Sequence, residues 1–161
     1  MCLVRLTSIL ALLLIGMLSA PNGGSAAPGK AFDTLLGAWS GVGKINFEGG
    51  RHERIKCNAY YTGGGPELRL AIRCASASYS VRIRSVLRQE GSKLLGTWEE
   101  RTYNASGNVT GRIAAHRISL SISGGGLSGS MSIGFGASRQ SVAISTSGIE
   151  LKGVKITLFK D

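Results

Sequence analysis

Apolar and polar residues alternate along most of the chain from Trp39 onward. Ile55 and Cys57, for example, alternate with Arg54 and Lys56. A period of two residues is typical of strands that have one buried and one exposed face, as in antiparallel sheets. The same alternation returns further along the chain, at 68–74, 79–88, 109–113, 118–123, 127–135, 142–144 and 149–158, where Gly153 fits a bulge. A further strand is predicted to open at Gly96 and run to Tyr103, with a turn at 104–107.

Glycine-rich segments such as 63–66 and 124–126 separate these stretches and predict turns. A helix is suggested only at 31–36, and short strands joined by short loops indicate a sandwich or an up-and-down barrel. Glycines inside the strands, including Gly96 and Gly111, favour the tight curvature of a barrel. We therefore expect an all-β fold, a single antiparallel up-and-down β-barrel of about 8–10 short strands that follows a signal peptide.

The first 26 residues have the features of a secretory signal peptide. Arg5 precedes an apolar run at 9–17, and small residues then lead to a plausible cleavage site before Ala27. We expect cleavage there, a periplasmic or secreted location, and no transmembrane span in the mature chain. The predicted organisation is a signal peptide at 1–26, a linker or short helix at 27–36 and the barrel domain at 37–161.

Two cysteines remain after removal of the signal peptide, Cys57 and Cys74. Export implies an oxidising compartment, in which an even pair of cysteines forms a disulfide. Both fall on the apolar face of strands that a glycine-rich turn joins, which is the arrangement a cross-strand bridge needs. Two free thiols are the alternative.

The chain is strongly basic, with 19 Lys and Arg against 9 Asp and Glu and a formal net charge of +10. This balance favours anionic partners such as an envelope surface, and export makes nucleic acid a poor choice of partner. Arginines gather on one predicted face of two neighbouring strands, where they bind anions or form an ordinary solvated surface. The members of this stripe are Arg69, Arg73, Arg82, Arg84 and Arg88.

Gly37 and Trp39, after a short N-terminal turn, resemble the opening of lipocalins, and Gly96-Thr97-Trp98 resembles a strand opening in avidin-type barrels. Both groups are calycins, so the resemblance implies a small antiparallel barrel, although a tryptophan at these positions could also simply plug one end of a barrel. A small barrel would bind an apolar or amphipathic ligand in its mouth. In such a barrel we expect aromatic residues to line the ligand site, together with one carboxylate, Glu100. The aromatic candidates are Trp39, Tyr61, Tyr79 and Trp98.

The layout of the mature chain also resembles small exported proteins of α-proteobacteria, through stretches such as 55–57, 70–75 and 96–100. This resemblance implies a periplasmic or secreted home and carries over no activity. A further resemblance, in layout only, is to small periplasmic barrels that inhibit secreted metalloproteases. Those barrels share a signal peptide, an early tryptophan and one disulfide.

The sequence offers little for catalysis. His52 and His116 stand apart from other metal-ligating residues, so we expect no metal site, no cofactor and no catalytic residue. Glu100 alternates onto the same face as Trp98, which would make it a buried carboxylate. A buried carboxylate needs partners, either as part of the structure or as part of a ligand site.

These observations leave three interpretations open. The first is a monomeric, non-enzymatic barrel that binds a small apolar or amphipathic ligand. The second is a surface-acting protein, such as a protease inhibitor or an envelope component, with a filled barrel and an exposed segment at 27–36. The third is a small outer-membrane barrel with its apolar face outward, which the few aromatic residues and the predicted disulfide disfavour.

Overall fold

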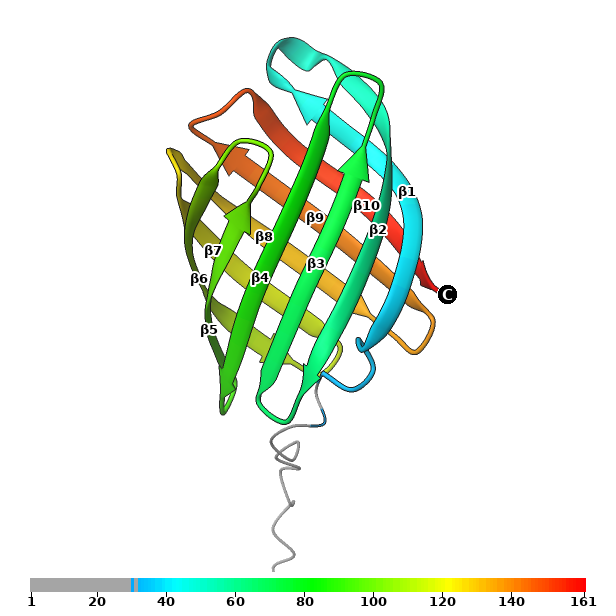
Figure 1. Cartoon of the computed structure of the whole chain (residues 1–161), viewed down its shortest axis with the longest axis vertical. Helices are drawn as coiled ribbons and strands as arrows, with labels where there is room; N and C mark the ends of the chain where they lie inside the picture. The colour runs from blue at the N-terminus through cyan, green and yellow to red at the C-terminus, as the bar shows by residue number, and fades with distance from the viewer. Residues whose placement is uncertain (1–29, 31) are drawn as a thin grey trace, which may run out of the picture.

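A computed structural model describes residue 30 and residues 32–161 of the chain (Figure 1). The predicted signal peptide lies outside the described residues. Ten strands follow one another along the chain and close into a barrel. Their bounds are β1 (Gly37–Phe47), β2 (His52–Gly64), β3 (Glu67–Ala75), β4 (Ser80–Glu90), β5 (Lys93–Glu100), β6 (Ala105–Ala114), β7 (Arg117–Gly124), β8 (Leu127–Phe135), β9 (Arg139–Ser147) and β10 (Leu151–Lys160).

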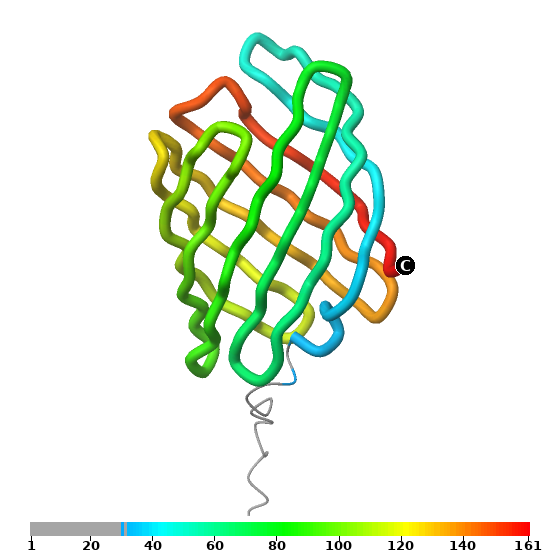
Figure 2. Tube along the Cα trace, in the orientation of Figure 1, coloured from blue at the N-terminus to red at the C-terminus, as the bar shows by residue number. Residues whose placement is uncertain are grey.

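Each strand pairs antiparallel with its neighbour in sequence, and β10 pairs with β1 to close the barrel. The chain trace shows this as hairpins that run up and down around the barrel (Figure 2). A short 3-10 turn, Glu48–Gly50, joins β1 to β2. The predicted single antiparallel up-and-down barrel is therefore confirmed, with ten strands.

One end of the barrel is filled by the segment that precedes β1. Phe32 and Leu35 are both 0% exposed, and Leu35 donates its backbone N–H to the carbonyl of Phe32 at 2.8 Å. The residues at 32–35 form hydrogen-bonded turns rather than the helix considered from sequence. The indole Nε1 of Trp39 donates to the carbonyl of Leu35 at 2.7 Å and fastens this segment to β1. We call this the plugged end.

Inward-facing glycines allow β1 to lie very close to β10. A Cβ at Gly41 would lie 2.0 Å from the carbonyl oxygen of Thr157, and one at Gly43 would lie 2.1 Å from that of Lys155. Side chains at these positions would clash with the neighbouring strand, so glycine is what lets the sheet curve tightly. The register shifts between Asn46 and Phe47, opposite the predicted bulge at Gly153.

The turn between β5 and β6 differs from the sequence prediction. The strand ends at Glu100 rather than at Tyr103, and the turn is at 101–104 instead of 104–107. The carboxylate of Glu100 accepts the backbone N–H of Tyr103 at 2.6 Å, which bends the chain early. Asn104 completes the turn with a φ of 54°, a conformation that asparagine tolerates better than most residues.

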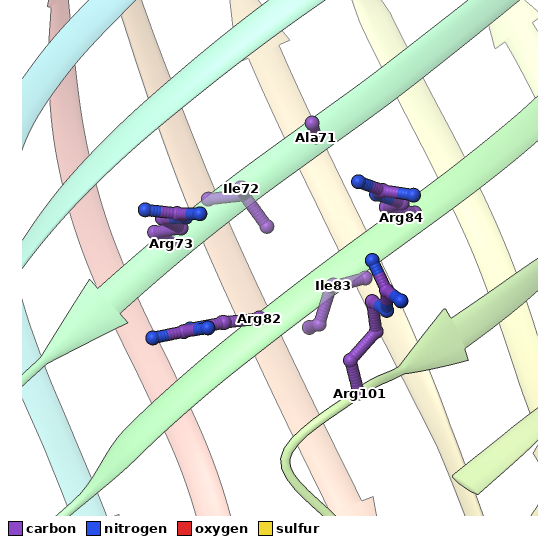
Figure 3. A pocket seen from close by; sticks show the side chains of 7 residues that line it. All are labelled: Ala71, Ile72, Arg73, Arg82, Ile83, Arg84 and Arg101. Atoms are coloured by element: carbon purple, nitrogen blue, oxygen red, sulfur yellow. The ribbon is translucent and has the colours of Figure 1, made fainter. Parts of the chain in front are cut away.

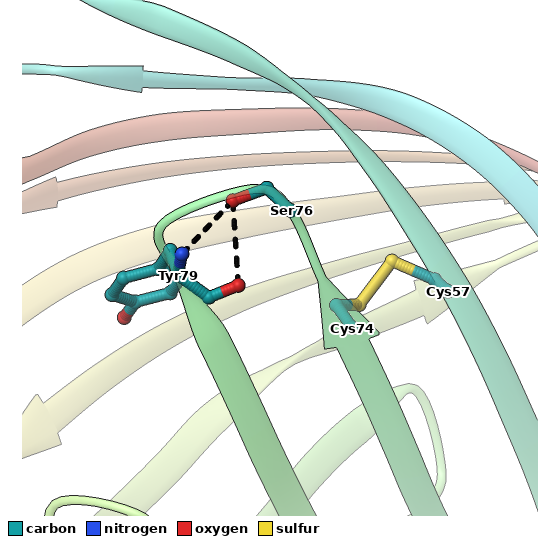
Figure 4. Close-up of a disulfide and its surroundings, with 4 residues drawn as sticks. All are labelled: Cys57, Cys74, Ser76 and Tyr79. Atoms are coloured by element: carbon teal, nitrogen blue, oxygen red, sulfur yellow. Dashed lines mark hydrogen bonds between the residues drawn. A yellow bond between two sulfur atoms is a disulfide. The ribbon is translucent and has the colours of Figure 1, made fainter.

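Cys57 and Cys74 lie directly opposite each other in the β2–β3 ladder and form a disulfide with a Cα–Cα distance of 4.1 Å (Figure 4). The predicted pairing of these cysteines is confirmed. Both side chains are buried, so the bridge adds to the apolar core inside the barrel.

The apolar faces of the strands point into the barrel, and the outer face carries most of the charged and polar side chains. This orientation is the opposite of the outward apolar face that the third interpretation requires. Among the described residues, no helix has the length and apolar character needed to span a membrane.

Candidate functional site

The barrel interior is not equally packed along its walls. Strands β3 and β4 form one wall and β8 and β9 lie behind it (Figure 1). Several inward-facing apolar side chains on these walls and on the neighbouring β7 are only partly buried. We call them the half-buried lining: Leu70, Ile72, Val81, Ile122, Met131 and Ile144.

Inward-facing side chains are more completely buried at the plugged end than in the half-buried lining. Inward-facing side chains there, such as Leu94, Ile118 and Leu158, are 0% exposed. Next to the half-buried lining, Gly96, which faces inward, adds no side chain to the interior. Apolar side chains that stay partly exposed on the inner face are candidates for contact with a ligand, so the half-buried lining is the candidate site in the interior.

Two of the predicted lining residues, Trp39 and Tyr61, lie toward the plugged end. Trp39 is 0% exposed and belongs to the plug. The phenol of Tyr61 donates to Oε1 of Gln140 at 2.9 Å. Gln140 is itself 0% exposed, and its Nε2 has no hydrogen-bond partner among the described residues. Burial raises the pKa of the Tyr61 phenol, so the phenol stays protonated and keeps its donor role.

Tyr79 lies at the opposite end of the barrel, in the loop between β3 and β4. Its ring packs edge-on against Phe47 and stacks on Tyr103, with centroid distances of 5.7 and 5.8 Å. Its backbone N–H donates to Oγ of Ser76, which fixes the loop next to the disulfide (Figure 4). Burial, with smaller effects of Tyr103 and Glu100, raises the pKa of Tyr79 to about 12.

Trp98 and Glu100 are neighbours on the inner face of β5. Trp98 is buried and donates from Nε1 to the carbonyl of Ser123 at 3.2 Å. The carboxylate of Glu100 is also buried and accepts the backbone N–H groups of Arg82 and Tyr103. Burial opposes the charge, but these donors outweigh it and lower the pKa of Glu100. Its oxygens are thus used by the turn, in line with the structural role considered from sequence.

A second carboxylate, Glu53, is held at the same end, and the sequence did not single it out. It accepts hydrogen bonds from Oγ of Ser76 at 2.6 Å and from the backbone N–H of Ser78 at 3.1 Å, and Arg51 lies 3.3 Å away. The hydrogen bonds from Ser76 and Ser78 lower the pKa of Glu53 to about 2. This cluster ties the start of β2 to the β3–β4 loop.

The predicted arginine stripe is on the outer face of β3 and β4, where Arg73 lies directly opposite Arg82. Two members of the stripe, Arg69 and Arg88, lie outside the depression described next. Arg69 forms an ion pair with Glu67 at 2.7 Å, and Arg88 lies opposite Glu67 in the ladder.

Four arginines surround a surface depression of about 440 Å³ (Figure 3). Arg73, Arg82 and Arg84 come from β3 and β4, and Arg101 reaches toward Arg84 from the turn after β5. We call these four residues the arginine cluster. Arg101 is absent from the predicted stripe because that stripe was drawn from two neighbouring strands alone.

Among the described residues, no group of three or more His, Cys, Asp and Glu side chains is arranged to hold a metal ion. His52 lies near the carbonyl of Gly50, and His116 packs edge-on against Phe135.

Comparison with known proteins identifies the fold. The crystal structure of Rv2717c from M. tuberculosis matches with a TM-score of 0.64 at 14% identity, covering 82% of this chain and 96% of that chain. The S-type phycobiliprotein lyase CPES from Guillardia theta matches with a TM-score of 0.52 at 10% identity, covering 82% of this chain and 91% of that chain. The chain has a lipocalin-like fold. No protein-family model matches it, and no curated protein matches it.

Proposed function

We propose that the protein is an exported, non-enzymatic binding protein whose barrel takes up a small apolar or amphipathic ligand. The observation that carries this proposal is the half-buried lining on facing walls of a closed barrel. Its six members are apolar, so an alkyl or aromatic group would be the part of the ligand that they cover. The likeness to the lyase CPES is consistent with ligand binding by a small β-barrel.

The interior also offers one polar group to such a ligand. Nε2 of Gln140 is buried without a partner among the described residues, and an unpaired buried donor is costly. A ligand oxygen that reached it would remove that cost. This favours an amphipathic ligand with an oxygen-bearing end over a pure hydrocarbon.

The surface-acting alternative predicts an exposed, ordered segment at 27–36. Phe32 and Leu35 are instead buried in the plugged end, so this part of the segment does not form an exposed arm. The barrel interior therefore takes precedence over the N-terminal segment as the proposed site.

Native mass spectrometry of the protein purified from its own host, before and after organic extraction, tests the proposal. We expect a mass above that of the chain that extraction removes, and the released compound shows the ligand class. The same spectrum reads out the expected monomer. A chain that carries no extra mass and takes up no added 1-dodecanol would contradict the proposal.

A pair of variants on one strand locates the binding. Ile144→Trp places a bulky ring among the half-buried lining, whereas Ala143→Trp adds the same ring on the exposed outer face. We expect the first variant to retain less 1-dodecanol and the second to retain as much as the original protein. Dodecanol is uncharged, so the basic outer surface does not contribute to its binding.

Export has its own test. N-terminal sequencing of the mature protein is expected to begin at Ala27, and an intact Met1 on protein from the cell envelope would contradict cleavage.

A further inference from the structure

The arginine cluster carries an unusual amount of unpaired positive charge. Among the described residues, Arg84 is the one member of the cluster whose guanidinium has an ion-pair partner, Glu99, at 3.9 Å. Within the described part of the chain, Arg73, Arg82 and Arg101 have no ion-pair partner. The cluster therefore has guanidinium donors that its own chain leaves free.

The nearest buried carboxylate does not accept hydrogen bonds from these guanidinium groups. Glu100 lies on the inner face beside the cluster, and its two oxygens accept the backbone N–H groups of Arg82 and Tyr103. The guanidinium of Arg82 is left on the outer side. The inward carboxylate thus fixes the backbone of the cluster without closing the depression.

The arrangement of the cluster also places like charges close together, so its guanidinium groups repel one another. Arg73 and Arg82 are directly opposite in the ladder, and like charges at such positions destabilise a sheet. Arg84 and Arg101 lie on the other side of the Ile72–Ile83 pair (Figure 3). A bound anion would offset the repulsion within both halves of the cluster.

We propose that the arginine cluster binds a ligand that carries adjacent phosphate groups. The planar guanidinium fork matches the oxygens of phosphate in two-pronged fashion, and four forks around one depression exceed what a single carboxylate can use. A depression of about 440 Å³ has room for more than one phosphate. This proposal does not depend on the proposed ligand in the barrel interior.

Calorimetric titration of the full chain with inorganic pyrophosphate tests the proposal. In Arg73→Gln/Arg82→Gln we expect the dissociation constant to rise about tenfold or more, because charge-assisted hydrogen bonds are lost. The control is Arg69→Gln/Arg88→Gln, which removes the same charge from the same two strands outside the depression. We expect the control to change binding by less than about threefold.

A second arm identifies the source of the phosphate. The protein is sedimented with phosphatidylcholine vesicles that contain or lack diacylglycerol pyrophosphate, a lipid whose headgroup carries two adjacent phosphates. Binding of free pyrophosphate supports a soluble phosphorylated ligand, and cluster-dependent binding only to the diacylglycerol pyrophosphate vesicles supports a lipid headgroup. Absence of binding in both arms overturns the proposal, and so does an equal loss in the two double variants, which would mean that net charge alone is responsible. Far-UV circular dichroism confirms that each variant is folded, and since all four residues are exposed we expect no change.

Discussion

The phenol of Tyr61 on β2 donates a hydrogen bond of 2.9 Å to Oε1 of Gln140 on β9, across the apolar interior. The two residues are 79 positions apart in sequence, and both are buried. Together they form a polar pair inside the barrel, next to the plugged end. Because each depends on the other, their substitutions are expected to be strongly non-additive.

Tyr61→Phe would leave the amide of Gln140 wholly unpaired. We expect it to lower the free energy of unfolding by about 1–3 kcal/mol, the typical cost of an unsatisfied buried polar group. Adding Gln140→Leu removes the orphaned amide, so the double variant should recover much of the loss. Urea unfolding of the original protein and the three variants measures this. Additive losses in the double variant would mean that the two residues do not act as a pair.

Removal of the disulfide is expected to weaken the fold without changing it. Cys57 and Cys74 are separated by 17 positions, and closing a loop of this size contributes about 3 kcal/mol in the entropic model. Cys57→Ser/Cys74→Ser should therefore unfold at lower urea than the oxidised protein. Reduced original protein provides the control and should match the double variant. A reduced protein as stable as the oxidised one would contradict this role.

A methyl group at Gly41 is expected to strain the closure of the barrel between β1 and β10. The Cβ of Gly41→Ala would lie 2.0 Å from the carbonyl oxygen of Thr157, and overpacking of this kind costs about 1–3 kcal/mol or more. The control is Gly64→Ala, where a Cβ meets nothing within 4 Å. We expect the control to stay within about 0.5 kcal/mol of the original protein by thermal unfolding. Equal effects of the two substitutions would rule out the close approach as the cause.

Acid stability is expected to depend on Glu53. Its pKa in the folded protein is about 2, below the ordinary 4.5. A lowered pKa in the folded state means that the contribution to stability is full above about pH 4.5 and is lost as the pH falls toward about pH 2. Glu53→Gln should therefore be less stable at neutral pH and lose less on acidification. Urea midpoints over this pH range measure the effect.

The exposed Glu90 provides the comparison, because the structure shows no hydrogen bonds to its side chain among the described residues. Glu90→Gln should keep the acid dependence of the original protein. If both substitutions reduce the loss of stability at low pH by the same amount, the Ser76 and Ser78 contacts to Glu53 are not responsible for it.

Much of the fold could be predicted from the sequence, because a period of two residues assigns each side chain to one face. Once Cys57 and Cys74 fall on the same face of strands joined by a short turn, their pairing follows. The end of β5 could not be predicted, since it depends on the hydrogen bond from Tyr103 to Glu100. Arg101 was missed for another reason, since the predicted stripe took in two neighbouring strands and not the one that follows them.

The candidate site was harder to predict for a similar reason. Gln140 occupies an inward position, but its partner lies on β2, and nothing local marks the pair. Alternation also shows which side chains point inward without showing how well they fill the interior. The difference between the filled plug at Phe32 and the half-buried Met131 appears only when the strands are assembled.

Met131 gives the most direct test of ligand uptake by the barrel. The chain has three methionines, and Met131 is the one among the described residues, where it faces the interior from β8. After cleavage before Ala27, a protein with ¹³C-labelled methionine methyl groups would show a single methionine signal from inside the barrel. We predict that 1-dodecanol shifts this signal and gives nuclear Overhauser contacts between the Met131 methyl group and the alkyl chain. An unshifted Met131 signal without contacts, at dodecanol concentrations that saturate any binding, would contradict uptake by the barrel.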